Sequence, residues 1–236
     1  MHIISTKTLN GHTNWVYSVF AINNLIISGS ADSSIKIWDI NTHECIATLN
    51  GHTRAVRSVF AINNLIISGS ADKSIKIWDI NSHKCITTLN GHTNYVNSVF
   101  AINNLIISGS WDNSIKIWDI NSHKCIATLN GHTNTVNSVF AINNVIISGS
   151  DDNSIKIWDI ESGKCINTLN CHVWFVRSVF AINNKIICGS SDETVKINEF
   201  VSHEQIFTAL MCMWKLGYPN EIIHEIFSWL GINTYA

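Results

Sequence analysis

The sequence predicts an all-β fold made of five similar four-stranded units, followed by a short helical segment. Two observations carry this prediction. A pattern of about 40 residues recurs five times between residues 11 and 210, and repeats of this length form arrays in which each unit packs against its neighbours. Within each unit, short runs of β-branched and aromatic residues alternate with turn residues, which is typical of antiparallel strands.

The first unit shows the four expected strands. They are VYSVFAI (16–22), LIISGS (25–30), SIKIWDI (34–40) and CIATLN (45–50). Asn23-Asn24 fits a two-residue hairpin, because Asn tolerates the positive φ that a type I′ turn requires. LIISGS is apolar on both faces, as expected for a strand packed between neighbouring sheets.

The dipeptides Gly-His and Trp-Asp mark each unit. Gly-His begins at residues 11, 51, 91 and 131, with Cys-His at 171–172, and Trp-Asp begins at residues 38, 78, 118 and 158, with Asn-Glu at 198–199. This pattern resembles the WD repeat, in which each repeat contributes a four-stranded blade to a β-propeller. The resemblance implies a propeller over residues 1–210 and a separate tail over 211–236. The implied repeats are 11–50, 51–90, 91–130, 131–170 and 171–210, preceded by a strand at 3–9.

The strand count leaves the closure of the ring open. Residues 1–10 and 201–210 both align with the fourth strand of a unit. Either segment could therefore complete the last blade, and 204–210 could leave the N-terminal strand without a partner. We expect a closed five-bladed ring rather than an open arc, which would expose strand edges and favour self-association.

A Ser-His-Asp set recurs in four units and invites comparison with hydrolases. An active site is rarely copied four times in one chain, and no Gly-x-Ser-x-Gly motif is present to hold a nucleophile. The WD resemblance implies instead that these residues and the Trp of the third strand form a structural hydrogen-bond network. We therefore expect neither catalysis nor a cofactor. The network residues are His12, Ser28, Asp32, Trp38, His52, Ser68, Asp72, Trp78, His92, Ser108, Asp112, Trp118, His132, Ser148, Asp152 and Trp158.

The fifth unit departs from this set. Cys188 replaces the Ser and Asn198 replaces the Trp. A buried polar network must be satisfied to be stable. We therefore expect an incomplete network in this unit, which would make its blade the loosest.

The recurring cysteines and histidines are not expected to form disulfides or to bind metal. Cysteines at 45, 85, 125 and 165 occupy one position in successive units, too far apart for a bond that needs Cα atoms within about 7 Å. We expect them to be buried, reduced thiols. Histidines at 43, 83, 123 and 203 lie in loops that diverge from blade to blade, whereas metal ligands must converge.

The composition excludes several classes of protein. A formal net charge of −2, with 14% charged residues, gives no basic patch for nucleic acid. No run approaches the roughly 18 apolar residues of a membrane span, and the N-terminus has no apolar signal segment. We expect a soluble protein in the cytoplasm, in the host cytoplasm if the chain is viral.

The differences between units point to a binding surface. Units 51–90 and 91–130 match at 34 of 40 positions, and five of the six differences fall at 54–57 against 94–97 and at 71–73 against 111–113. In a four-stranded meander, both segments lie on the same rim of the blade. Large aromatic residues and Arg, which dominate interface energetics, gather there. We expect this rim to bind a protein or peptide through Trp15, Tyr17, Arg54, Arg57, Tyr95, Trp111, Asp151, Trp174, Phe175 and Arg177.

The segment after the repeats predicts an amphipathic helix. Its apolar residues recur at helical spacing, its proline suits the first helical turn, and Gly231 can end the helix. This pattern resembles the opening of an F-box, which implies docking on a Skp1-type adaptor. The implied adaptor-binding residues are Pro219, Ile222, Ile223, Ile226, Phe227 and Leu230.

Two functions follow from these features. A repeat array followed by an F-box-like segment resembles viral ankyrin-repeat proteins, and implies a substrate-recruiting subunit of a cullin-type ubiquitin ligase whose propeller binds the target. The alternative is a non-catalytic scaffold whose C-terminal helix caps its own propeller.

Overall fold

The structure, a computed structural model, describes residues 6–199 of the 236-residue chain. Most of these residues belong to one compact unit, Met1–Ala181 with Ile187–Lys196. Of the second unit, Ile182–Ile186 with Ile197–Ala236, only residues 182–186 and 197–199 are described. The predicted tail, its helix and the strand at 204–210 lie outside the described residues.

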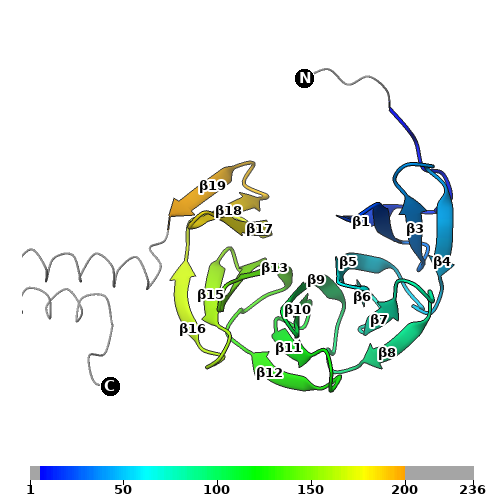
Figure 1. Ribbon diagram of the computed structural model, residues 1–236. Helices are drawn as coiled ribbons and strands as arrows, with labels where there is room; N and C mark the ends of the chain where they lie inside the picture. Colours follow the sequence, from blue (N-terminus) through cyan, green and yellow to red (C-terminus); the bar gives the residue numbers. More distant parts are fainter. Residues whose placement is uncertain (1–5, 200–236) are drawn as a thin grey trace, which may run out of the picture. The chain divides into compact units, whose positions relative to one another are not determined.

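The described residues form five sheets, which we call blades 1 to 5 (Figure 1). Blades 1–4 have four strands in chain order, and blade 5 has three. Blade 1 contains β1 (Val16–Ile22), β2 (Leu25–Ser30), β3 (Ile35–Asp39) and β4 (Cys45–Leu49). Blade 2 contains β5 (Val56–Ile62), β6 (Leu65–Ser70), β7 (Ile75–Asp79) and β8 (Cys85–Leu89). Blade 3 contains β9 (Val96–Ile102), β10 (Leu105–Ser110), β11 (Ile115–Asp119) and β12 (Cys125–Leu129). Blade 4 contains β13 (Val136–Ile142), β14 (Val145–Ser150), β15 (Ile155–Asp159) and β16 (Cys165–Leu169), and blade 5 contains β17 (Val176–Ile182), β18 (Lys185–Ser190) and β19 (Val195–Glu199).

The all-β fold and its repeating strands are confirmed. In blade 1 the first two strands have the predicted bounds, and the third and fourth are shorter by one or two residues. The predicted N-terminal strand at 3–9 is wrong over its described part, because residues 6–9 form no strand. Residues 3–5 lie outside the described part of the chain.

The hairpin turns differ in part from the prediction. Asn23, Asn63, Asn103 and Asn143 have φ between 52° and 54°, but the second Asn of each of these pairs has no positive φ. A type I′ turn needs positive φ at both positions. Blade 5 meets this condition, with φ of 47° at Asn183 and 60° at Asn184.

Successive blades pack through a valine pair of one blade against a glycine of the blade before it. A Cβ on Gly69 of β6 would lie 2.7 Å from Val96 Cγ1 and 3.0 Å from Val99 Cγ1, both on β9. Gly29, Gly109 and Gly149 make the same close approach to the following blade. The missing side chain therefore brings each pair of sheets close enough to bury their isoleucines completely.

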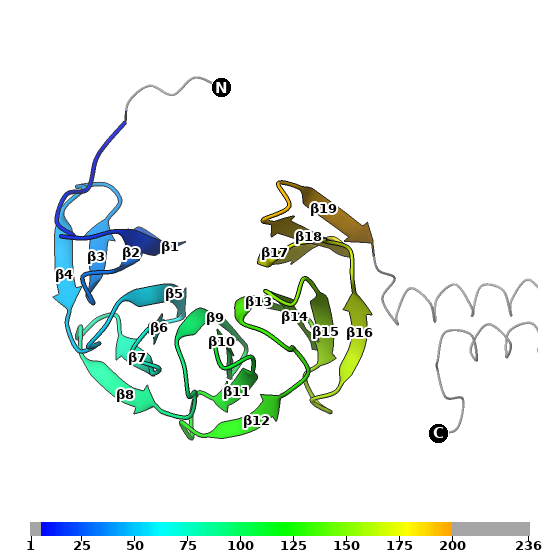
Figure 2. The ribbon, with the colours of Figure 1, turned by 180° about the vertical axis from the view of Figure 1, so that it is seen from behind.

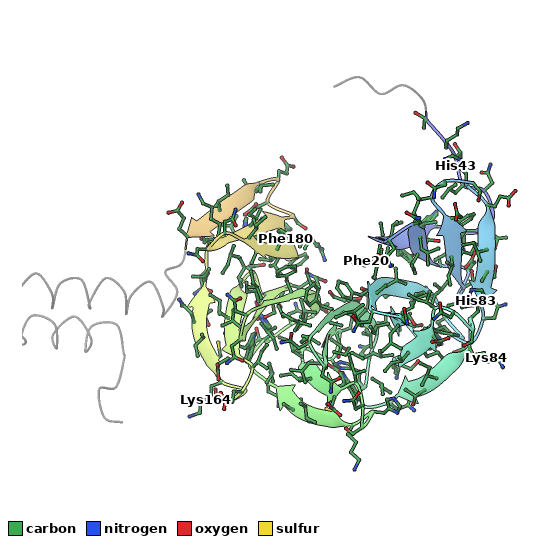
Figure 3. The ribbon with its side chains drawn as sticks, viewed as in Figure 1. Phe20, His43, His83, Lys84, Lys164 and Phe180 are labelled. Carbon is green, nitrogen blue, oxygen red and sulfur yellow. The ribbon has the colours of Figure 1, made fainter. Side chains whose placement is uncertain are left out.

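Two further contacts repeat at each junction. Phenylalanines of neighbouring inner strands, from Phe20 on β1 to Phe180 on β17, pack in a tilted arrangement with ring centroids 4.4 to 4.7 Å apart. A valine N–H also donates to a serine of the preceding inner strand, as from Val59 to Ser18 Oγ at 3.0 Å. Figures 2 and 3 show the neighbouring inner strands side by side, with Phe20 and Phe180 labelled in Figure 3.

The faces at the two ends of the array lack this cover. Val19 of blade 1 is 61% exposed, whereas its counterpart Val59 is 4% exposed. In blade 5, Val195 is 71% exposed, and a Cβ on Gly189 would meet no atom within 4 Å. The described residues therefore do not show closure, and the closed ring stays a prediction.

Residues 6–199 contain no helix with the length and apolar character needed to cross a bilayer.

Adding a methyl group at a glycine between blades should destabilise the fold. Gly69→Ala places a Cβ against two valines, and overpacking of this kind costs about 1–3 kcal/mol. Gly189→Ala is the matched control, since the same position in blade 5 is open. Urea denaturation of both variants measures the difference. Equal stability of Gly69→Ala and the wild type would show that the valine–glycine contact does not limit packing.

Candidate interaction surface

In each blade, a backbone hydrogen bond joins the two variable segments. The N–H of Ala71 donates to the carbonyl of Ala55 at 2.9 Å, and Trp111 donates in the same way to Tyr95 at 2.9 Å. We call the resulting surface the variable rim. It consists of residues 14–17, 54–57, 94–97, 134–137 and 174–177, together with 31–33, 71–73, 111–113, 151–153 and 191–193.

The opposite rim holds the other turns of each blade. The N–H of Ile80, in the turn after β7, donates to the carbonyl of Asn64 in the turn after β5 at 2.9 Å. The Asn-Asn pair recurs unchanged in all five blades. The variation between blades 2 and 3 is therefore concentrated on one rim, as predicted.

A pocket of about 250 Å³ opens on the variable rim. Its lining takes one residue from the same position of each inner strand, and these residues are Tyr17, Arg57, Asn97, Asn137 and Arg177. Asn97 and Asn137 were not among the predicted site residues. The constant spacing of 40 positions from Tyr17 onward is a signal that could have identified them.

Arg57 lies among three aromatic rings at one side of this pocket. Its guanidinium carbon is 5.4 Å from the ring centroids of both Tyr17 and Trp111 and 6.0 Å from that of Tyr95. These distances are within the range of cation–π attraction. Arg54 approaches the same group, with Nη1 3.4 Å from Tyr95 Oη.

The aromatic pair in this cluster is specific to blade 3. Tyr95 and Trp111 stack with centroids 4.8 Å apart, at positions where blade 2 has Ala55 and Ala71. The two differences between the blades therefore form one contact. This pairing argues against the alternative that the two loops acquired unrelated neutral substitutions.

Arg177 anchors a second cluster, between blades 4 and 5. Its Nη1 lies 2.9 Å from Asp151 Oδ1, and its Nε donates to Ser191 Oγ at 2.9 Å. The guanidinium carbon is 4.8 Å from the Phe175 ring centroid. Asn137 Nδ2 also donates to Asp151 Oδ1, at 2.6 Å. Asp151 thus neutralises Arg177, whereas the ion pairs found within residues 6–199 do not include Arg57.

All ten predicted rim residues are at least partly exposed. Trp15 is 74% exposed and Trp174 57% exposed, and Tyr17 and Trp111 are each more than 40% exposed. Exposed aromatic groups of this size commonly mark a site of interaction. Binding of a partner by these residues stays a prediction.

The recurring His-Ser-Asp-Trp set is joined by hydrogen bonds in blades 1–4. In blade 2, His52 Nδ1 lies 2.7 Å from Asp72 Oδ2 and His52 Nε2 lies 2.8 Å from Ser68 Oγ, which also accepts a bond from Trp78 Nε1 at 2.9 Å. Ser68 has no exposed surface. A buried hydroxyl that is already held by two partners cannot reach a substrate, so this geometry opposes a hydrolase role.

The carboxylates of these networks are held in the charged form. Burial raises the pKa of Asp72, but hydrogen bonds from His52 and Ser74 outweigh it and bring the pKa below its ordinary value. The same balance lowers the pKa of Asp32, Asp112 and Asp152. These carboxylates therefore favour the fold only while they are ionised.

One cysteine prediction is wrong. The thiols of Cys45, Cys85, Cys125 and Cys165 are exposed rather than buried. Each begins an outer strand, where its Sγ lies 3.2 to 3.4 Å from the carbonyl oxygen two residues further on. These strands have no blade outside them, so half of their side chains face solvent.

The remaining site predictions have different outcomes. His43, His83 and His123 lie in exposed turns with φ of 59° to 66°, and His203 lies outside the described residues. The six residues predicted to bind an adaptor, Pro219 to Leu230, also lie outside the described part of the chain.

The lowered pKa of Asp72 predicts a specific loss of stability in acid. Because the folded pKa lies below the ordinary value of 3.8, the stabilisation is complete above about pH 5 and is lost as the pH falls toward the folded pKa. Asp72→Asn should cost about 1–2 kcal/mol at pH 7 and should flatten the dependence of stability on pH below about 5. Urea denaturation at pH 7, 4 and 3 tests this. Parallel pH profiles for the variant and the wild type would contradict it.

Comparison with known proteins agrees with this geometry. The family model described as WD domain, G-beta repeat, matches residues 4–39, 43–79, 83–119, 123–159 and 163–197. The chain is 46% identical over 39 residues to WD repeat-containing protein pop2 of Schizosaccharomyces pombe, a match that covers 16% of this chain and 6% of that protein. It is also similar to the crystal structure of the computationally designed Ika8 protein, with a TM-score of 0.76 and 29% identity over 81% of this chain and 60% of that one. The matches thus span less than two thirds of the length of either protein. The five matched segments cover most of the sequence, and the chain belongs to the WD40 repeat family.

Proposed function

We propose that this chain is a protein-interaction module whose variable rim binds a protein or peptide with an acidic side chain. WD repeats imply a protein–protein interaction scaffold. The observation that supports the rim as the binding surface is its pocket, where five equivalent strand positions bring different side chains together. The surrounding framework is almost identical from blade to blade.

Arg57 is the proposed anchor for the acidic group. Aromatic rings pack near its guanidinium, and a planar guanidinium can stack on rings while its N–H groups remain able to bind a carboxylate in a bidentate manner. Stacking also restricts the side chain before binding, which reduces the entropy lost on association. Asn97 and Asn137 complete the polar lining of the same pocket.

The exposed aromatic residues extend the proposed contact beyond the pocket. Trp111 is one of the rings around Arg57, and Trp15 contacts the Tyr17 ring edge to face, with centroids 6.4 Å apart. Trp174 lies next to Phe175, with centroids 6.1 Å apart. Apolar residues on either side of the acidic group would cover these rings. The proposal does not depend on closure of the ring, because every residue of the pocket belongs to the described array.

A sharper form of the proposal concerns the tail. The F-box-like sequence at 219–230 favours a substrate-recruiting subunit of a Skp1/cullin-type ubiquitin ligase, with the target on the variable rim. The alternative remains a scaffold whose C-terminal helix caps its own propeller. Both forms place the chain in the cytoplasm.

Loss of the Arg57 cluster should weaken binding without weakening the fold. Peptides selected from a library with a central Asp or Glu, using the immobilised full chain, serve as the probe. Arg57→Ala and Trp111→Ala should each reduce affinity by about 1–3 kcal/mol, measured by fluorescence anisotropy, and should leave thermal stability nearly unchanged.

Lys84→Ala provides the matched control for these two variants. Lys84 is exposed in the turn after β7, on the opposite rim, and its removal should leave peptide affinity unchanged. If the selected peptides bind Arg57→Ala as tightly as the wild type, the Arg57 cluster is not the binding site.

The ligase form of the proposal predicts that the full chain binds a purified Skp1-type adaptor. Phe227→Asp places a charge on the apolar side of the predicted helix and should reduce adaptor binding at least tenfold. Glu225→Gln, on the polar side of the same segment, should bind like the wild type. Size-exclusion chromatography and calorimetry measure both. If the wild type does not bind the adaptor and Phe227→Asp lowers the melting temperature, the scaffold alternative is correct.

A further inference from the structure

Blade 5 departs from the other blades at the glycine, serine and tryptophan positions of the repeated pattern. Cys171 replaces the glycine of the Gly-His dipeptide, Cys188 replaces the serine, and Asn198 replaces the tryptophan. Two of the three changes introduce a thiol, and both thiols neighbour the histidine that every blade keeps. Two thiols beside a histidine are a common set of metal ligands.

The first and third changes are linked by packing. In blade 2, a Cβ on Gly51 would lie 3.0 Å from Trp78 Cη2. Blades 3 and 4 show the same distance between the glycine position and the tryptophan. A tryptophan at this position therefore leaves little room for a side chain at the glycine. Blade 5 has a side chain there, Cys171, together with a smaller residue, Asn198, in place of the tryptophan.

The three donor groups of blade 5 converge. One ligand atom from each of Cys171, His172 and Cys188 lies within 4.8 Å of the other two. His172 Nε2 lies 3.1 Å from Cys188 Sγ. Ligands of tetrahedral Zn²⁺ lie roughly 3.5–4 Å apart, given Zn–S near 2.3 Å and Zn–N near 2.0 Å. These separations would need to change by only about 1 Å or less to match such a site.

The histidine has the orientation that a metal ligand needs. His172 Nδ1 lies 2.8 Å from Asp192 Oδ2, so the carboxylate holds the proton on Nδ1 and leaves the Nε2 lone pair directed toward Cys188. Carboxylate–histidine–zinc arrangements of this kind fix the tautomer and strengthen the ligand. Thr194 donates to Asp192 Oδ1 at 2.5 Å and holds the carboxylate in turn.

Burial and access also fit a metal site. His172 and Cys188 are 5% and 1% exposed, and Cys171 is half-buried. An ion could therefore enter past Cys171 and bind mostly away from water. Within residues 6–199, this is the cluster in which three potential metal-ligating side chains lie close to one another.

We propose that blade 5 binds one Zn²⁺ ion through Cys171 Sγ, His172 Nε2 and Cys188 Sγ, with a fourth position for water. Binding forms two Zn–S bonds and one Zn–N bond, and it releases the two thiol protons to solvent. The two thiolates balance the charge of the ion. Because Cys171 and His172 precede β17 and Cys188 lies in β18, the ion would join the two segments that the histidine–serine bond joins in other blades, as between His52 and Ser68 in blade 2. The expectation of no metal, which considered only the loop histidines, is revised for this blade.

Cobalt titration of the full chain tests the site. The protein is reduced with a phosphine, freed of metal with a chelator and titrated with Co²⁺, whose thiolate complexes absorb by charge transfer. We expect the protein to bind one equivalent of Co²⁺ and Zn²⁺ to displace it. We also expect Zn²⁺ to raise the melting temperature of the protein.

Three variants separate this site from the other thiols. Cys188→Ser and Cys171→Gly restore the residues of blades 1–4, so they suit the fold, and each should weaken Co²⁺ binding at least tenfold. Cys165→Ser removes an exposed thiol of blade 4 and should bind like the wild type. The proposal is overturned if no metal binds, if Cys188→Ser and Cys171→Gly bind normally, or if mass spectrometry finds a Cys171–Cys188 disulfide in protein isolated under reducing conditions.

Discussion

The contact between a valine pair and the glycine of the preceding blade is the constraint on which the rest of the structure depends. With no Cβ at Gly29, Gly69, Gly109 and Gly149, each sheet approaches the next closely enough to bury isoleucines on both sides. A single blade has two apolar faces and cannot bury either of them alone. Stability therefore comes from the junctions, and the residues that form them cannot vary. The identity of the junction residues from blade to blade follows from this demand.

The same constraint leaves one surface free to differ. Residues that face a neighbouring blade are held constant, while the variable rim carries different side chains at equivalent positions. The packing also sets the distances across that rim, because Arg57 reaches Tyr17 of the blade before it and Trp111 of the blade after it. A pocket formed by one residue from each blade is a property of the array and not of any repeat. Binding specificity can thus change by substitution at a few positions without loss of the fold.

The repeating strands could be predicted from the sequence because their periodicity and turn residues are local signals. The side of the array that carries the variable residues could also be inferred, since the meander determines which turns share a rim. The 40-residue spacing marks Asn97 and Asn137 as equivalent to Arg57, but whether equivalent positions line one pocket depends on the angle between blades, which the sequence does not show. The exposure of Cys45 and its counterparts was missed for a related reason, as nothing in the local pattern shows that no sheet covers the outer strand. Likewise, Cys171 and Cys188 are 17 residues apart in the chain, and only pairing of the strands brings their sulfur atoms together.

Hydrogen exchange of the intact chain, followed by mass spectrometry, tests most directly whether contacts between blades stabilise the array. Amides in β6, β10 and β14, which lie between two blades, should exchange slowest, because they open only when the array unfolds. Amides in β1 and β19 should exchange much faster, since Val19 and Val195 lack the cover that their counterparts have. Equal protection of β1, β10 and β19 would contradict the account, because it would mean that stability resides within each blade or that the end faces are covered.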